Sequence, residues 1–164
     1  MPDLETFKQL IQATYKIMQA IIFTGIQATG KSTFYKQNFF NTHVHISLDL
    51  LRTRNREQIF LQACCQTQQK FVVDNTNPTI EERQRYIKLA HTSKYEVVGY
   101  YFESKIKEAL ERNSTRHGKS LVPEKGILGT YHRLEVPSLA EGFDQLFYVR
   151  LTEEGLFEVT PWKS

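Results

Sequence analysis

Short apolar runs alternate with segments of helical periodicity along most of this chain of 164 residues. An apolar run between turn signals is typical of a buried strand, and apolar residues three and four positions apart are typical of an amphipathic helix. We therefore predict strands over residues 20–23, 42–48, 71–73, 95–102, 146–151 and 156–159, and helices over residues 31–40, 49–70, 79–91, 104–116 and 123–136. Strands that are separated by helices pair in parallel through right-handed crossovers. The pattern thus predicts an α/β fold with a doubly wound parallel sheet, closed by a hairpin partner at residues 156–159.

Local signals refine three of the predicted helix ends. Thr79 is expected to cap the helix that follows it, because Glu81 and Glu82 occupy the first turn, where the helix dipole favours carboxylates. Ser104 is expected to cap the next helix in the same way. The long helix over residues 49–70 is expected to break near Asn55.

A further amphipathic helix is predicted ahead of the first strand, within residues 1–18. Its apolar residues fall on one helical face: Leu4, Phe7, Leu10, Ile11, Thr14 and Met18. We expect this leading helix to pack on the sheet. The alternative is a helix that lies on a membrane surface, but the polar face is not notably basic.

Composition narrows the class of protein. Hydrophobic residues make up 40% and charged residues 24%, values that are ordinary for a soluble globular protein, and the whole chain, 1–164, reads as one domain. The net charge of +3 neither indicates a nucleic-acid partner nor opposes a polyanion. Cys64 and Cys65 are adjacent in a predicted helix, so they form neither a disulfide framework nor a zinc pair. Without a signal peptide or a spanning segment, the chain is expected to be cytoplasmic and to have no membrane partner.

One motif follows the first predicted strand and precedes the first helix, which is the position that a phosphate-binding P-loop requires. The stretch from Gly25 to Thr33 fits the pattern G-x-x-x-x-G-K-[ST], whose backbone N–H groups bind phosphate oxygens at a helix N-terminus. Lys31 is expected to reach the β- and γ-phosphates of ATP, and Ser32 to hold Mg²⁺. The predicted ATP-binding residues of the loop are Gly25, Gln27, Ala28, Thr29, Gly30, Lys31, Ser32 and Thr33. The alternative is a glycine turn followed by a solvated lysine.

Polar residues follow the second and third predicted strands, where ligands of parallel sheets bind. Asp49 and Arg52 lie three positions apart, so they share a side if a helix begins there. Asp49 is expected to act as general base on a hydroxyl that attacks the γ-phosphate, and Arg52 to clamp a phosphate of the acceptor. The alternative is an N-cap with an ion pair one turn on.

Asp74 ends the strand over residues 71–73, the position of a carboxylate that orients Mg²⁺ in P-loop enzymes. An Asx turn that begins the following Asn-Pro turn is compatible with that role. Asn75 and Asn77 are predicted to donate to substrate, or else to satisfy the turn.

The segment over about residues 110–135 is rich in cations and is predicted to form a lid. Arg112 and Arg116 share a helix face, and we expect both to bind ATP and Arg116 to neutralise charge in the transition state. Gly118, Gly126 and Gly129 would let this lid move. The alternative is that these cations only complement a helix C-terminus. The five histidines show no metal-ligand spacing, and His43 and His45, on one strand face, are read as structural or exposed.

These elements together resemble the kinase domain of 5′-hydroxyl polynucleotide kinases of the polynucleotide kinase/phosphatase type. The resemblance rests on the P-loop, on Ser47-Leu48-Asp49-x-x-Arg52, on Val73-Asp74-Asn75-Thr76-Asn77-Pro78, and on Arg112-Asn113-Ser114-x-Arg116 followed by Val122-Pro123. The stretch from Pro137 to Asp144 is similar to the end of that kinase domain. The resemblance runs from about Gln19 to Val149.

The resemblance implies ATP and Mg²⁺ as cofactors, a 5′-OH end of DNA or RNA as substrate, and a role in nucleic-acid repair. In that arrangement Arg52 contacts the phosphate on the 3′ side of the acceptor nucleotide, while Arg112 and Arg116 act from the lid. The chain shows no phosphatase or ligase segment, so such a partner is expected to be separate. Two other functions remain open: a small-molecule kinase that acts on a sugar, nucleoside or antibiotic hydroxyl, and an ATP-binding switch or ATPase.

Overall fold

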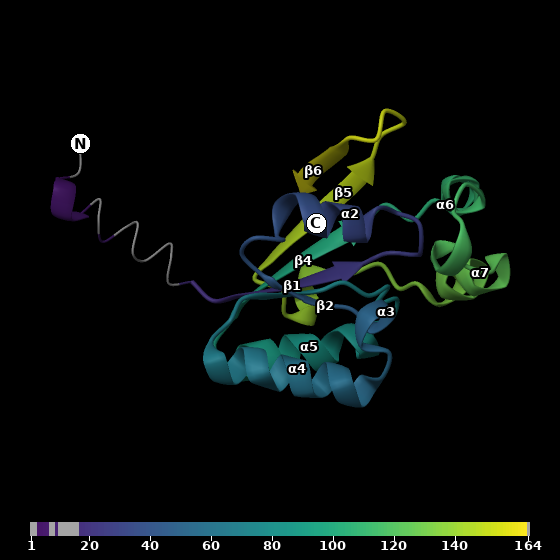
Figure 1. Ribbon diagram of the computed structural model, residues 1–164. Coiled ribbons are helices and arrows are strands. Elements are labelled where there is room, and N and C mark those ends of the chain that lie inside the picture. The colour runs from purple at the N-terminus through teal and green to yellow at the C-terminus, as the bar shows by residue number, and fades with distance from the viewer. Residues whose placement is uncertain (1–2, 7–8, 10–16, 164) are drawn as a thin grey trace.

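The computed structural model describes residues 3–6, 9 and 17–163, and a six-stranded sheet forms its centre (Figure 1). The strand order is β2-β3-β1-β4-β5-β6. The strands are β1 (Gln19–Thr24), β2 (Val44–Ile46), β3 (Phe71–Val73), β4 (Glu96–Phe102), β5 (Gln145–Leu151) and β6 (Phe157–Pro161). Neighbouring strands from β2 to β5 pair in parallel, and β6 runs antiparallel to β5 at the edge. The predicted doubly wound sheet with a closing hairpin is confirmed.

The helices cover both faces of the sheet, which explains why the central strand β1 is buried along nearly its whole length. The helices are α2 (Lys31–Asn38), α3 (Leu48–Leu51), α4 (Arg54–Thr67), α5 (Ile80–Thr92), α6 (Ile106–Ser114) and α7 (Glu124–Arg133), with short 3₁₀ turns at Gly118–Ser120 and Leu139–Glu141. In Figure 1, α4 and α5 lie below the sheet and α2 lies above it. Successive residues of β1 point to opposite faces of the sheet. Ile22 packs with Leu61 and Ile87 in one apolar cluster, and Phe23 packs with Phe34 in another.

The helices α6 and α7 are attached to the P-loop by a third, smaller apolar cluster. Ile26, Ala109 and Ile127 are fully buried together in it. Hydrogen bonds reinforce this attachment, because Gln27 Nε2 donates to Thr130 Oγ1 at 3.0 Å. The base of the predicted lid is therefore fixed to the loop that it serves, while Gly126 and Gly129 lie inside α7 rather than at a hinge.

One predicted helix cap is wrong, whereas the predicted break in the long helix is present, two to three residues before Asn55. Ser104 does not cap α6, whose N-cap is Lys105, because its hydroxyl instead accepts the N–H of Ile26 at 3.1 Å. The break in the long helix falls at Arg52 and Thr53, and Thr53 caps α4 by accepting the N–H of Arg56. By contrast, Thr79 caps α5 as predicted, in a reciprocal capping box with Glu82.

The predicted leading helix lies mostly outside the described residues. Of the apolar positions on its predicted face, Leu4 is exposed, and Met18 is partly buried against the core. No helix within the described part of the chain has the length and apolar composition needed to cross a bilayer.

Candidate active site

The P-loop joins β1 to α2, and two of its glycines are required by close packing. Gly30 caps α2 in a left-handed conformation with φ 91°, and a Cβ atom there would lie 2.8 Å from Phe157. A Cβ atom on Gly25 would lie 2.9 Å from the Cβ of Phe102. Both positions therefore exclude a side chain, which lets the loop backbone present its N–H groups at the start of α2.

Lys31 is the buried cation of this loop, with 8% of its surface exposed. Its Nζ donates to the carbonyl oxygens of Gly25 at 3.0 Å and Ile26 at 2.7 Å. Burial lowers the pKa of Lys31 to about 8; the nearby Asp74 opposes this shift, Arg116 adds to it, and Asp49 opposes it. Two carboxylates and a second cation from three other parts of the chain thus act on the P-loop lysine.

Ser32 and Asp74, the two predicted magnesium ligands, lie in hydrogen-bond contact. The Ser32 hydroxyl donates to Asp74 Oδ2 at 2.7 Å, and Asp74 is 5% exposed. A hydroxyl and a carboxylate are hard oxygen ligands, and Mg²⁺ commonly takes one or two protein ligands beside phosphate and water. The described residues contain no cluster of three or more acidic, histidine or cysteine side chains suited to a metal. The donor set therefore fits a cation that is shared with a nucleotide.

His45 belongs to this group, although its sequence pattern did not indicate a site role. Its Nε2 lies 2.8 Å from Asp74 Oδ2, and its ring stacks on Tyr35 at 4.0 Å between centroids. Its role could have been predicted only from the strand order, because β2 pairs with β3, the strand that Asp74 follows. His43, the other histidine of this segment, is buried instead, and burial lowers its pKa to about 4.

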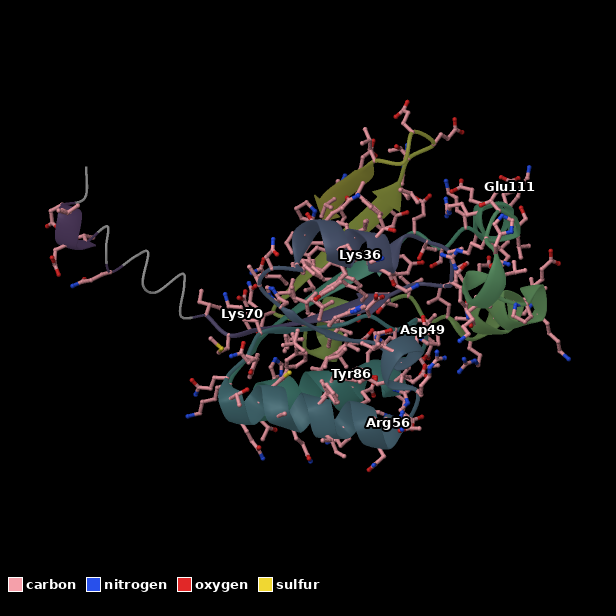
Figure 2. The ribbon with its side chains drawn as sticks, viewed as in Figure 1. Lys36, Asp49, Arg56, Lys70, Tyr86 and Glu111 are labelled. Atoms are coloured by element: carbon pink, nitrogen blue, oxygen red, sulfur yellow. The ribbon has the colours of Figure 1, made fainter. Side chains whose placement is uncertain are left out.

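One cavity of about 710 Å³ brings the predicted donor and acceptor residues together. Its lining comes from the P-loop, from α3, from the end of β3 and from the segment between α6 and α7: Gln27, Ala28, Gly30, Lys31, Ser32, Thr33, Leu48, Asp49, Arg52, Asp74, Asn75, Thr76, Arg116, Lys119, Ser120 and Val122. Figure 2 shows Asp49 at the end of the sheet that is nearer to α6 and α7. Both Asp49 and Arg52 are exposed to this cavity from the short helix α3 and its end.

Three of the predicted ATP-binding residues, Gly25, Thr29 and Arg112, do not line the cavity. Gly25 donates its N–H to Thr76 O at 3.0 Å, and the Thr29 hydroxyl donates to Ile26 O at 2.9 Å. Arg112 uses its Nε to hold Ala28 O at 2.6 Å. These three residues hydrogen-bond to backbone carbonyl oxygens in or next to the P-loop, whereas Arg116 lines the cavity itself.

The two asparagines after β3 differ in position. Asn77 is 2% exposed and does not line the cavity; its Nδ2 donates to Phe23 O at 2.8 Å, so the structure gives it a fold-supporting contact in place of the predicted substrate contact. Asn75 lines the cavity, but its amide is engaged by Leu48 and Glu57. Lys119, Ser120 and Val122 belong to the predicted lid segment but were not predicted as site residues, and they line the cavity together with Arg116.

Known proteins match this chain in sequence and in structure. The AAA domain family matches residues 21–137. A bifunctional polynucleotide phosphatase/kinase of Schizosaccharomyces pombe is 25% identical over 129 residues, which are 76% of this chain and 32% of that protein. A putative bifunctional polynucleotide phosphatase/kinase of Acanthamoeba polyphaga mimivirus is 27% identical over 153 residues, 88% of this chain and 36% of that protein. Kti12 of Chaetomium thermophilum, solved with ADP-AlF3, has a TM-score of 0.65 at 16% identity and covers 83% of this chain and 92% of its own.

The predicted resemblance to polynucleotide kinases is confirmed by the two curated relatives, although the chain spans only about a third of their length. The family match begins within β1 and ends just beyond α7, so it includes the P-loop, α3, the end of β3 and the cationic segment. The structural match shows the same fold. The site and the matches together identify a domain with a P-loop kinase-type fold and a nucleotide-binding loop, and the chain belongs to the AAA domain family.

Proposed function

We propose that this protein transfers the γ-phosphate of ATP to the 5′-hydroxyl end of DNA or RNA. The observation that carries the proposal is that Asp49 and Arg52 line the same cavity as Lys31 and Ser32. A base and a phosphate clamp thus face a triphosphate-binding loop, as a kinase with a phosphate-bearing acceptor requires. The names of both curated relatives point to the same chemistry.

The donor side binds and orients ATP through the P-loop backbone and Lys31. Ser32 and Asp74 would hold Mg²⁺, which supplies charge neutralisation at the β- and γ-phosphates when bound. Lys31 lines the cavity together with Asp49 and Asp74 and would contact the phosphate oxygens as their charge develops. Arg116 enters from the segment between α6 and α7 and would neutralise the same charge.

The acceptor side is formed by α3 and the residue that ends it. In the reaction the acceptor hydroxyl oxygen attacks the γ-phosphorus, its proton passes to the Asp49 carboxylate, and the bond from that phosphorus to the β–γ bridging oxygen breaks. ADP leaves with the electrons of that bond, and the product carries a new phosphate ester. Arg52 would bind the next phosphate of the acceptor strand, for which a planar guanidinium is suited.

The choice of a polynucleotide over a neutral small molecule rests on the charges of the cavity. Arg52 lines the acceptor side of the cavity, so this side carries a cation that a neutral sugar or nucleoside would leave unpaired. A nucleic-acid end carries a backbone phosphate that matches this guanidinium.

The test is a transfer assay with γ-labelled ATP. Single-stranded, nicked, DNA and RNA acceptors with 5′-OH ends are compared with a panel of sugars, nucleosides and aminoglycosides, and Lys31→Ala and Asp49→Asn serve as controls. We expect label on oligonucleotides and its loss in both variants. Label on a small molecule instead would establish the small-molecule kinase, and release of free phosphate alone would establish an ATPase.

A further inference from the structure

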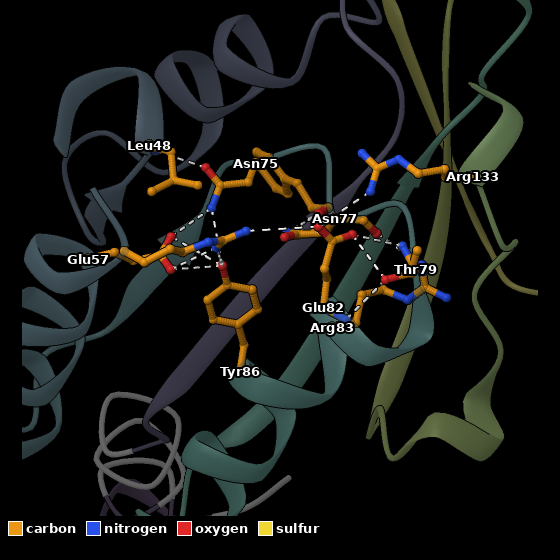
Figure 3. Close-up of polar contacts among 11 residues, drawn as sticks. Leu48, Glu57, Asn75, Asn77, Thr79, Glu82, Arg83, Tyr86 and Arg133 are labelled. Carbon is orange, nitrogen blue, oxygen red and sulfur yellow. Dashed lines mark hydrogen bonds and ion pairs between the residues drawn. The ribbon is translucent and has the colours of Figure 1, made fainter. Parts of the chain in front are cut away.

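The side chain of Asn75 is fully engaged by the protein, although it lines the cavity. Its Oδ1 accepts the N–H of Leu48 at 2.9 Å, and its Nδ2 donates to Glu57 Oε2 at 2.9 Å and to the Tyr86 hydroxyl at 3.3 Å. Leu48 is the first residue of α3, the helix that carries Asp49. The amide of Asn75 therefore ties the start of the acceptor helix to the end of β3 and to α4 and α5 (Figure 3).

Glu57 is the buried centre of these contacts, with 4% of its surface exposed. The Tyr86 hydroxyl donates to its two oxygens at 3.0 and 3.1 Å, and Arg54 Nη1 donates at 3.0 Å. Burial, and then the nearby charge of Glu57, raise the pKa of Tyr86 to about 12, so the phenol keeps its proton near neutral pH. A buried polar network whose members are all paired rigidifies the elements that it joins.

The backbone at the far end of α3 shows why that helix needs to be held. Arg52 has φ 72° and ψ −34°, and the N–H of Thr53 donates to Leu51 O at 2.9 Å, so a tight γ-turn follows the helix. An arginine in the left-handed half of the map persists only where the surroundings impose it. Both flanks are anchored here, Leu48 by Asn75 and Arg54 by Glu57.

We propose that Glu57 and Tyr86 are positioning residues, which act through Asn75 to hold α3 so that Asp49 and Arg52 face the P-loop. Neither of the two lines the cavity, so they act through α3 and not on the substrate. The contacts among Arg54, Glu57, Asn75 and Tyr86 form what we call the α3 clamp. The expected effect of the α3 clamp on phosphate transfer rests on the proposed function. Its effect on the structure does not, because the hydrogen bond from the Leu48 N–H to Asn75 forms whatever the substrate is.

A matched pair of variants separates positioning from stability. Tyr86→Phe removes the clamp hydroxyl. Tyr95→Phe removes another buried hydroxyl that also contacts α4, at its opposite end, where it donates to Cys64 O at 3.1 Å and Gln69 O at 2.7 Å. We expect Tyr86→Phe to lower kcat/KM for the acceptor about tenfold, through both kcat and KM, because small displacements of a catalytic group are costly. The KM for ATP should change less than about twofold, since the P-loop is held by other contacts.

Amide hydrogen exchange at Leu48 provides a readout that needs no substrate. Its N–H is donated to Asn75, so exchange should be faster in Tyr86→Phe than in the wild type and unchanged in Tyr95→Phe. Glu57→Gln, which keeps the shape of the side chain, should reproduce the effect if Tyr86→Phe folds poorly. Unchanged exchange at Leu48 in folded Tyr86→Phe and Glu57→Gln would overturn the proposal. So would acceptor kinetics that change equally in Tyr86→Phe and Tyr95→Phe. If the wild type transfers no phosphate to a 5′-OH end, the proposed function fails, and the exchange comparison still decides the clamp.

Discussion

The buried ion pair between Arg83 and Glu141 gives a sharp test of how the loop behind the site is held. Arg83 is fully buried, and its Nε and Nη2 contact the two oxygens of Glu141 at 2.7 and 2.8 Å. Its Nη1 donates to the carbonyl oxygens of Asn77 at 3.0 Å and Pro78 at 3.1 Å, directly after the residues that line the cavity. The pair therefore fixes the loop that carries Asp74.

Removing one partner of this buried pair should lower the free energy of unfolding far more than removing one partner of an exposed pair. Glu141→Ala leaves the Arg83 guanidinium buried without its counter-ion, which should lower the free energy of unfolding by about 3–5 kcal/mol. The control is Glu158→Ala, because Glu158 pairs with Arg150 at 3.5 Å and both side chains are about half exposed. That variant should change stability by about 0–1 kcal/mol.

Urea denaturation at neutral pH measures both variants, and the double variant Arg83→Met/Glu141→Leu tests the cause. Since an apolar replacement removes both charges, the double variant should recover much of the loss, short of the wild type because the carbonyl oxygens of Asn77 and Pro78 lose their donor. A loss below about 1 kcal/mol for Glu141→Ala, equal to that of Glu158→Ala, would refute the reasoning.

Three further predictions concern groups whose pKa the fold perturbs. Folding lowers the pKa of Lys31 from 10.5 to about 8, so the unfolded state binds more protons than the folded state between pH 8 and 10.5. The free energy of unfolding should therefore rise with pH across that window. The midpoint of urea denaturation should show this rise in the wild type and lack it in Lys31→Met. Burial lowers the pKa of His43 from 6.5 to about 4, and its Nε2 has no hydrogen-bond partner among the described residues, so stability should be lost as the pH falls through that range. His43→Phe should unfold at lower pH than the wild type, as followed by circular dichroism. Burial raises the pKa of the Cys64 thiol to about 11, so a thiol reagent near pH 8 should label Cys64 only after unfolding, as peptide mass spectrometry would show; rapid labelling of the folded protein would contradict the burial.

Much of the fold and the donor side of the site could be predicted from the sequence, because both rest on local patterns. The apolar runs gave the strand positions, and Gly25 to Thr33 placed the phosphate loop between a strand and a helix. The rule that ligands bind at the carboxyl ends of parallel strands then brought Asp49 and Asp74 to one cavity, as the structure shows.

The contacts that the sequence did not predict involve side chains whose partner comes from a distant part of the chain. Asn77 points inward because Phe23 O, more than fifty positions earlier, needs a donor. Ser104 and Arg112 hold the P-loop backbone, contacts that no periodicity reports. His45 meets Asp74 only because β2 and β3 are neighbours in the sheet, which depends on the strand order. Tertiary hydrogen bonds of this kind override the local preferences that sequence patterns measure.

The central claim is that Asp49 directs the γ-phosphate of ATP onto a nucleic-acid 5′-hydroxyl. Mass spectrometry of a 5′-OH oligonucleotide after incubation with ATP and Mg²⁺ tests it most directly, with Asp49→Asn alongside the wild type. We predict one added phosphate, located at the 5′ end, and at least a hundredfold slower addition in Asp49→Asn, since general base catalysis contributes about 10²–10⁴-fold. An oligonucleotide of unchanged mass while ATP is consumed, or equal rates in the two proteins, would contradict it.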